Sequence, residues 1–270
     1  MLSRQLSGTL EHTTPIEVDF LLYISAQKIK LDMIQHKIAR KWTQFWMRFA
    51  GLSYLGRIST RLATMFAPPY YGRCGFSCLN PKGYFAPSAT VHHNSVHFGK
   101  NVFIGDRVVI FQDKDGGVVE IGDRVHVYGE AFIQTGSGGS IKIGDDSHIH
   151  PRCQISAYKS SILIGDQVQI APNCAFYPYN HATEPGKLIR EQPFCSKGDI
   201  IVGDDVWMGF GVIVLDGVRI GKGAVIGAGS VVTHDIPDGG IAVGSPARVV
   251  KMRDEYPEKM QEINNQGQSN

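Results

Sequence analysis

No stretch of this sequence has the character of a membrane-spanning helix, because no apolar run within its 270 residues approaches the roughly 18 that a span requires. The N-terminus lacks the basic-then-apolar layout of a secretory signal. Charged residues make up 19% of the chain, and a formal net charge of +2 implies no general affinity for nucleic acid. We therefore expect a cytoplasmic protein that does not bind nucleic acid.

Cysteine is too scarce and too irregularly placed for a disulfide framework or a zinc centre. The five cysteines are an odd number, and Cys74 and Cys78 are separated by three residues rather than two. No paired set of histidine and cysteine completes a metal site, so we expect none. A reduced protein is the simplest interpretation.

What the sequence does contain is a six-residue repeat, an aliphatic lead residue followed by Gly and often by Asp. A period of six fits neither a 3.6-residue helix nor a two-residue strand alternation, and it is typical of hexapeptide β-helices. The unbroken leads, each six positions after the last, are Val202, Met208, Val214, Ile220, Ile226 and Val232. Weaker copies precede them at Phe98, Ile104, Ile121, Val127, Ile143, Ile149, Ile164 and Ile170.

Each repeat predicts one short strand and one corner, with the lead and a small residue four positions later pointing inward. Three repeats close one coil, so that 18 residues bring a side chain back above itself. Gly or Asn is expected where the chain turns with positive φ. The small inward positions are Val108, Val125, Ala131, Ser147, Cys153, Val168, Cys174, Val206, Val212, Val218, Ala224 and Ser230. The sequence therefore predicts an all-β fold, a left-handed parallel β-helix.

The spacing of the leads also locates a long loop. Ile164 and Val202 are 38 residues apart, which is one coil plus 20, and no lead pattern appears between Asn180 and Ile200. Loops of that length are usually functional or disordered.

Three parts follow along the chain. Residues 1–84 hold a polar tail, a helical segment and a linker; residues 85–252 form the β-helix; residues 253–270 form a polar tail, with a brief helix expected over residues 255–263. Between Phe20 and Met65 there are eight Lys or Arg residues and one Asp, mixed with aromatic residues. Such helices either cap the open first coil or lie on an anionic membrane, and the two roles are compatible if one helix face does each.

The long loop contains the best candidate for catalysis, His181, at its root. A free imidazole has a pKa of about 6.5, so it can accept a proton from an attacking hydroxyl or amine at neutral pH. Glu184 and Glu191 follow within reach by sequence, and a carboxylate could orient the imidazole. The alternative is a surface histidine that hydrogen-bonds a loop carbonyl.

The chain resembles the hexapeptide acyltransferases, in particular the galactoside, maltose and serine O-acetyltransferases and the polysaccharide acetyltransferases. The resemblance covers residues 98–253, and its most specific parts are Asn180-His181, residues 198–209, residues 225–233 and residues 244–250. It implies a homotrimer that uses acetyl-CoA as co-substrate and a saccharide as acceptor. No Ser or Cys lies in a nucleophile elbow, which agrees with direct attack without an acyl-enzyme.

By this resemblance His181 matches the catalytic base, and Trp207 shapes the acceptor and thioester end of the site. The loop residues Tyr179 and Asn180 are assigned to substrate binding. Small residues would line the pantetheine arm, and a polar or cationic set would meet the nucleotide end of coenzyme A. The cofactor-binding set is Gly209, Gly227, Ala228, Thr233, Arg248 and Lys251.

The resemblance has two departures. The glutamate that partners the base has no unambiguous counterpart; Glu191 is nearest in register, and Glu184 competes with it. The N-terminal segment does not resemble the acceptor-binding domain of the maltose and galactoside enzymes, so the acceptor cannot be carried over. We expect a sugar hydroxyl, in surface polysaccharide synthesis.

Three other functions are open to a hexapeptide β-helix. A zinc enzyme of the carbonic-anhydrase-like branch needs three converging histidines. His92 and His97 have a suggestive spacing, but residues 50–91 contain no histidine to complete the set. An N-acyltransferase acting on an amino sugar or a xenobiotic would use the same base. A non-catalytic trimeric scaffold is opposed by the intact His181 and Trp207.

Overall fold

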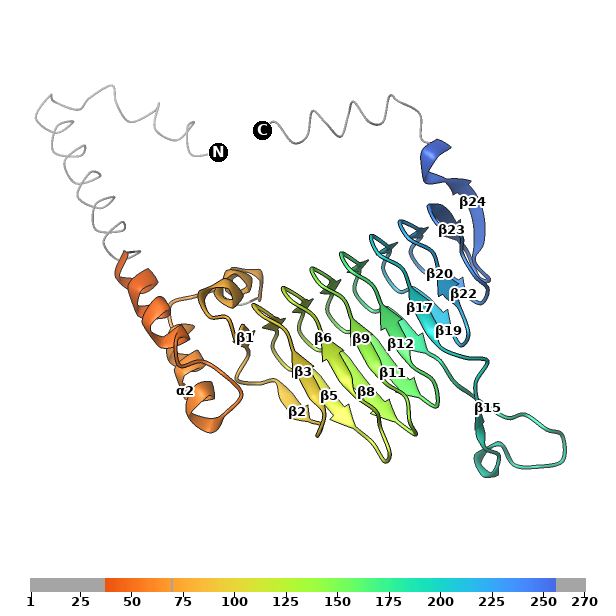
Figure 1. Ribbon diagram of the computed structural model, residues 1–270, viewed down its shortest axis with the longest axis horizontal. Helices are drawn as coiled ribbons and strands as arrows, with labels where there is room; N and C mark the ends of the chain where they lie inside the picture. Colours follow the sequence, from red (N-terminus) through yellow and green to blue (C-terminus); the bar gives the residue numbers. More distant parts are fainter. Residues whose placement is uncertain (1–36, 69, 256–270) are drawn as a thin grey trace, which may run out of the picture.

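The computed structural model describes residues 37–68 and 70–255 (Figure 1). The expected N-terminal polar tail, the part of the expected helical segment before residue 37 and all but the start of the helix expected at residues 255–263 lie outside this part of the chain. Within it, no helix combines the length and the apolar character that crossing a bilayer requires.

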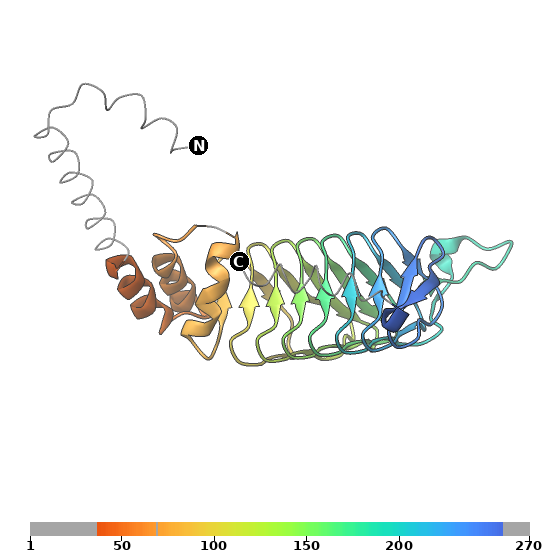
Figure 2. The same ribbon diagram turned by 90° about the horizontal axis from the view of Figure 1, so that it is seen from above.

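The predicted parallel β-helix of hexapeptide repeats is confirmed. Three parallel sheets form the sides of a prism, and successive strands of one sheet come from successive coils (Figure 2). The register Ile201 to Arg219 and Trp207 to Val225 shows the 18-residue coil directly. The strands run from Tyr84 to Met252, and η5 (Arg253–Glu255) follows them.

Sheet 1 consists of β1 (Tyr84–Phe85), β4 (Phe103–Ile104), β7 (His126–Val127), β10 (His148–Ile149), β13 (Gln169–Ile170), β18 (Trp207–Met208), β21 (Val225–Ile226), β23 (Gly240–Val243) and β24 (Arg248–Met252). Sheet 2 consists of β2 (Thr90–His92), β5 (Val109–Gln112), β8 (Phe132–Gly136), β11 (Gln154–Tyr158), β14 (Ala175–Tyr177), β19 (Ile213–Leu215) and β22 (Val231–Val232). Sheet 3 consists of β3 (Val96–Phe98), β6 (Val119–Ile121), β9 (Ile141–Ile143), β12 (Ile162–Ile164), β17 (Ile200–Val202) and β20 (Arg219–Ile220). The exception to the parallel pattern is β24, which pairs antiparallel with β23 and ends sheet 1.

The core of the prism is made by the predicted inward positions. The leads from Ile104 onward and the small residues four places after them are all buried, and Phe98 is partly buried against them. Stacked Ile and Val leads thus form apolar ladders, each buried side chain contributing roughly 1.5–3 kcal/mol relative to exposure. Cys153 and Cys174 occupy two of the small positions and are fully buried.

The expectation for the corners needs correction. For the leads from Phe98 to Ile226, the residue with positive φ stands three places after the lead. It is Gly in the last coils and Asn at Asn101 and Asn173, as expected, but other coils place Arg107, Arg124 or Gln167 there. The Gly directly after the lead has another cause. A Cβ on Gly144 would lie 2.5 Å from the carbonyl carbon of Gly165 in the next coil, so this position must stay small for the coils to stack.

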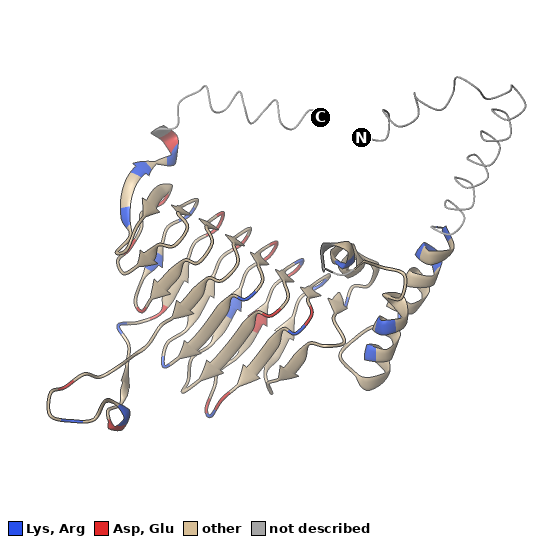
Figure 3. Ribbon diagram, turned by 180° about the vertical axis from the view of Figure 1, so that it is seen from behind, with Lys and Arg blue, Asp and Glu red and all other residues tan. Residues whose placement is uncertain are grey.

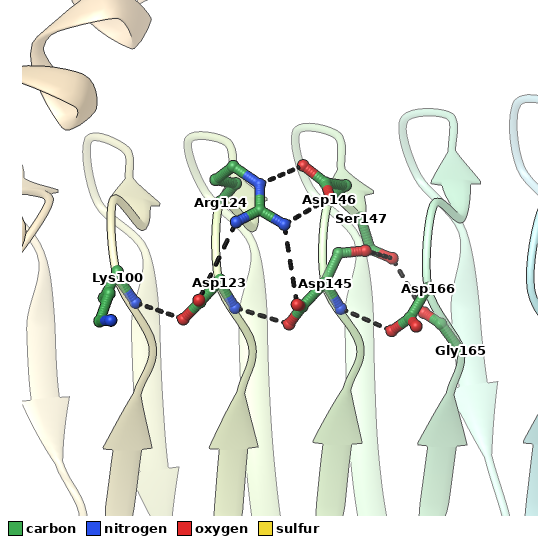
Figure 4. A network of polar contacts seen from close by, with 8 residues as sticks. All are labelled: Lys100, Asp123, Arg124, Asp145, Asp146, Ser147, Gly165 and Asp166. Carbon is green, nitrogen blue, oxygen red and sulfur yellow. Dashed lines mark hydrogen bonds and ion pairs between the residues drawn. The ribbon is translucent and has the colours of Figure 1, made fainter.

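The Asp that follows Gly in many repeats joins consecutive coils. A carboxylate oxygen of Asp145 accepts a hydrogen bond from the backbone N–H of Asp123 at 2.8 Å, and Asp166 does the same for Asp145 (Figure 4). These bonds satisfy corner N–H groups that would otherwise have no partner. The acidic residue of the repeat is therefore structural.

Insertions leave the prism at one edge, the corner between sheets 2 and 3. Short loops occur there between β5 and β6, between β8 and β9, and between β11 and β12, and the long segment 178–199 follows between β14 and β17. Because Ile164 pairs with Val202, the predicted reading of one coil plus a 20-residue loop is confirmed.

A helical cap covers the first coil, which confirms one of the two roles expected for this segment. Residues 37–47 are helical, α2 spans Tyr54–Ala63, and η3 spans Tyr70–Leu79. Met47 and Ala63 join the solenoid core. Arg57 anchors α2 by donating to the carbonyls of Pro87 at 2.9 Å and Ala89 at 2.8 Å.

Candidate active site

The long loop is an ordered two-stranded arm at the corner between sheets 2 and 3. β15 (Asn180–His181) pairs antiparallel with β16 (Phe194–Cys195), and η4 (Ile189–Glu191) lies toward the tip. Figure 1 shows the arm projecting from the solenoid at the end far from the helical cap. The buried side chain of Gln192 closes the arm, since its amide accepts from the N–H of Glu184 at 2.7 Å and donates to the carbonyl of Lys187 at 3.1 Å.

His181 lies on the first strand of this arm and is exposed to solvent. Its ring packs edge-on against Phe194, with 4.5 Å between ring centroids. This contact restricts the ring without burying it. The geometry therefore presents an accessible imidazole on an ordered element, which suits proton transfer to or from a bound molecule.

The root of the arm is fixed by Asp216, which is 5% exposed. One of its carboxylate oxygens accepts from the side-chain amide of Asn180 at 2.8 Å, and the other accepts from the backbone N–H of Lys197 at 2.8 Å. A backbone bond from Gly217 to Gly198 lies beside them. Asp216 thus binds both ends of the arm, one residue away from His181.

The two carboxylates expected beside the imidazole lie elsewhere on the arm. Glu184 pairs with Lys187 at 2.6 Å, and Glu191 lies 3.9 Å from Arg190. In the described part of the chain neither glutamate hydrogen-bonds or ion-pairs with His181. Which carboxylate orients the base therefore stays a prediction.

Tyr179 belongs to an aromatic cluster at the base of the arm. Its ring lies 5.4 Å from both Tyr158 and Phe194 and 5.9 Å from Tyr177. Burial raises the pKa of Tyr179 above its ordinary value. Tyr158 also hydrogen-bonds Asp113 in the insertion between β5 and β6. The arm and the shorter loops below it are thereby joined along one edge.

Trp207 lies on β18 in sheet 1 and is 54% exposed. Phe210, at the adjoining corner, is 55% exposed. Large exposed aromatic side chains of this kind are frequent at binding surfaces. Trp207 and His181 therefore occupy different sides of the prism in one chain.

Most of the residues assigned to coenzyme A gather at the corner between sheets 1 and 2 in the last coils. Gly209 stacks under Ala228, since a Cβ on Gly209 would lie 2.6 Å from the nitrogen of Ala228. Gly227 lies against Val243, which pairs with Arg248 on β24. Lys251 follows on the same strand, opposite Ile241. Coil stacking alone already requires Gly209 to be small.

Thr233 is separate from this group. It follows β22 at the corner between sheets 2 and 3, where its hydroxyl lies 2.8 Å from Nδ1 of the adjacent His234. It shares that edge with the arm, two coils further along sheet 2. The predicted residues thus divide into two groups, one at each edge of sheet 2.

Asp216 was not singled out in the sequence, although the repeat contains the signal. It lies 18 residues after Gly198, so the coil period stacks it on the second root of the loop. Gln192 and Phe194 gave no comparable signal, because no repeat runs through the arm.

Comparison with known proteins agrees with this architecture. Residues 199–234 match the family described as bacterial transferase hexapeptide (six repeats). A 68-residue stretch is 43% identical to the 2,3,4,5-tetrahydropyridine-2,6-dicarboxylate N-acetyltransferase of Staphylococcus aureus strain JH9, covering 25% of this chain and 28% of that protein. The chain thus spans little more than a quarter of the length of this curated relative.

Two solved structures are also similar to parts of the chain. A hexapeptide-repeat acetyltransferase from Vibrio cholerae is 33% identical over 42% of this chain and 62% of its own, with a TM-score of 0.38. The N-acyltransferase AntD from Bacillus cereus, determined with dTDP-4-amino-4,6-dideoxyglucose and coenzyme A, is 23% identical over 67% of this chain and 91% of its own, with a TM-score of 0.45. Residues 199–234 thus carry the hexapeptide repeat of bacterial transferases, and the coils of the solenoid follow the same repeat.

Proposed function

We propose that this protein is an acetyltransferase that moves the acetyl group of acetyl-CoA to a saccharide hydroxyl. The observation that carries the proposal is the exposed imidazole of His181 on an arm whose root is held by the buried Asp216. The match to the transferase hexapeptide family and the 43%-identical stretch of an N-acetyltransferase support acyl transfer as the reaction class.

In the proposed reaction the acceptor oxygen attacks the thioester carbonyl carbon directly. His181 accepts the hydroxyl proton as the new C–O bond forms, the C–S bond breaks, and the proton leaves with the coenzyme A thiol. General-base assistance of this kind contributes on the order of 10²–10⁴-fold to the rate. Acetyl-CoA would lie along Gly209, Gly227 and Ala228.

We propose that the active unit is a homotrimer. The imidazole and the coenzyme A group lie at opposite edges of sheet 2, roughly 15–20 Å apart if a side has about six residues at 3.3 Å each. A threefold assembly of prisms would bring the arm of one chain beside the other edge of its neighbour. The exposed apolar side chains of Trp207, Phe210 and Ile213 suit such a contact.

The donor and the cysteines favour a cytoplasmic location. Acetyl-CoA is a cytoplasmic metabolite, and all five cysteines are free thiols, as expected for a reducing compartment. Surface polysaccharide synthesis is the process that we propose for the acceptor.

Amine acylation is the second candidate, favoured by the N-acetyltransferase named above. The two can be separated by incubating the protein with acetyl-CoA and a panel of hydroxyl and amino sugars, followed by mass spectrometry and mild base. An acetyl ester is released in base, whereas an acetamide is retained. We expect a base-labile mass gain of one acetyl group. A base-stable gain would establish the amine acceptor, and turnover on no acceptor would support the non-catalytic scaffold.

A further inference from the structure

The helical cap has an unusual distribution of charge. Residues 33–105 contain nine Lys or Arg residues and no Asp or Glu, although the whole chain is nearly balanced at 27 basic and 25 acidic residues. Figure 3 shows Lys and Arg on the helices of the cap and no acidic residue there. In the described part of the cap, the cations outside η3 are Lys37, Arg40, Lys41, Arg48, Arg57 and Arg61.

The α2 helix buries small side chains and exposes three of its large apolar ones, while Leu62 is half-buried. Its buried face consists of Gly56, Ser59, Thr60 and Ala63. Tyr54 is 79% exposed, Leu55 is 73% exposed, and Ile58 follows on the same face. A helix that only packed on its own protein would bury the larger apolar side chains, since their burial stabilises most.

The preceding helix repeats this pattern with cations included. Its exposed positions Lys37, Lys41 and Phe45 recur every four residues and therefore share one face, and the exposed Arg48 follows directly after the helix. Phe45 and Phe49 are each at least half exposed and lie 5.6 Å apart. Cationic and aromatic side chains thus share a solvent-facing stripe.

Buried contacts hold both helices in this orientation. The indole N–H of Trp42 donates to the carbonyl of Leu62 at 2.7 Å, and the Thr43 hydroxyl donates to the carbonyl of Ala63 at 2.9 Å. Asn80 adds a bond to the carbonyl of Met47 at 2.8 Å. The outward faces are therefore fixed, and turning them inward would break these bonds.

We propose that the cap is a membrane-docking surface for the anionic face of a phospholipid bilayer. Basic helices with exposed aromatic and aliphatic side chains are built for that interface, where cations meet acidic headgroups and apolar side chains enter the acyl boundary. The absence of acidic side chains from residues 33–105 removes the repulsion that a mixed surface would meet. This inference does not depend on acetyl transfer.

The position of the cap also orients the proposed active site. The arm follows β14, four strands beyond β2 in sheet 2, so at about 4.8 Å per strand His181 stands roughly 20 Å along the solenoid axis from the first coil. If the cap binds a bilayer and the solenoid axis is perpendicular to the membrane plane, His181 lies in the water layer above the headgroups. A saccharide that projects from a lipid carrier would reach it, whereas the headgroup itself would not.

Vesicle flotation with the full chain tests the proposal. The probes are phosphatidylcholine vesicles alone and phosphatidylcholine vesicles that contain phosphatidylglycerol. We expect the protein to bind the vesicles that contain phosphatidylglycerol, and we expect added salt to weaken this binding. Replacing Lys41 and Arg48 by Ala removes two exposed cations, and at about fivefold each, equivalent to about 1 kcal/mol per cation, the partition coefficient should fall roughly 25-fold.

A matched control and a second variant keep the test decisive. Lys142→Ala removes a cation that is also exposed, from sheet 3, and should leave binding unchanged. Leu55→Ser and Ile58→Ser together should weaken binding while the thermal melt of the protein is retained. Equal affinity for both vesicle types, an effect of Lys142→Ala as large as that of the cap variants, or a change of oligomeric mass without a change in flotation would overturn the proposal.

Discussion

Asn180 and Asp216 are joined by a 2.8 Å hydrogen bond that ties the first strand of the arm to the next coil of the solenoid. The same carboxylate holds Lys197 at the other root. A side chain buried in the corner of the prism therefore sets the position of His181, the residue that follows Asn180.

Asp216→Ala should lower kcat on the order of 100-fold, because a misplaced base costs about that much even when its chemistry is intact. The KM for acetyl-CoA should change little, since Asp216 contacts the arm and not the proposed cofactor corner. The kcat of Asp216→Asn should lie between those of the wild type and Asp216→Ala, because the Asn amide keeps one acceptor oxygen. Steady-state kinetics measures both parameters.

Asp166→Ala is the matched control for that experiment. It removes a corner carboxylate with an equivalent bond to a backbone N–H, but away from the arm. If Asp166→Ala lowered kcat as much as Asp216→Ala, coil stability and not the arm would explain the loss.

Gly209→Ala should destabilise the protein more than Gly211→Asn does. The added methyl group at position 209 would lie 2.6 Å from the nitrogen of Ala228, and overpacking of this kind costs about 1–3 kcal/mol. Gly211 has a positive φ of 71° but open space around it, and Asn173 already adopts φ of 61° one coil earlier. Thermal unfolding measures both variants; equal melting temperatures would contradict the stacking explanation.

Stability should fall as pH decreases from about 6.5 to about 4. His126 stacks on His148 at 4.6 Å, and burial, with a smaller contribution from His148, lowers the pKa of His126 to about 4. The unfolded chain then binds more protons than the folded chain in this interval, so the free energy of unfolding rises with pH there and levels off above it. His126→Phe should flatten this dependence in thermal melts at several pH values. An unchanged slope would assign the acid sensitivity to other groups.

Four of the five cysteines should divide into two classes of reactivity, with the half-buried Cys74 between them. Cys78 and Cys195 are exposed, whereas Cys153 and Cys174 are fully buried in adjacent coils. Alkylation followed by peptide mass mapping should label the first pair in the folded protein and the second pair only after unfolding. Early labelling of Cys153 would contradict the closed core.

The repeat was sufficient to predict most of the fold because its period determines which side chains stack on one another in successive coils. The leads, the small inward positions and the coil-plus-loop interval between Ile164 and Val202 all follow from counting to six and eighteen. The residue types at the corners did not follow from the repeat. Arg107 and Arg124 take positive φ because hydrogen bonds between coils stabilise that conformation, and the local preference of Gly for positive φ does not take those bonds into account.

The candidate site was less predictable for a physical reason as well. His181 could be named from its place on the loop, but its neighbours depend on how an arm without repeats folds. Phe194 and Gln192 contact the arm across a hairpin that no periodicity encodes. Glu184 and Glu191 looked close to His181 along the chain, yet both side chains pair with neighbouring cations.

The central claim is that His181 acts as the base in acetyl transfer. The most direct test compares wild type with His181→Ala in acetyl-CoA turnover with the accepted sugar, alongside calorimetric binding of coenzyme A. The account predicts a loss of about 10²–10⁴-fold in kcat with coenzyme A affinity and melting temperature retained. Full turnover by His181→Ala, or a wild-type protein that does not bind coenzyme A, would contradict it.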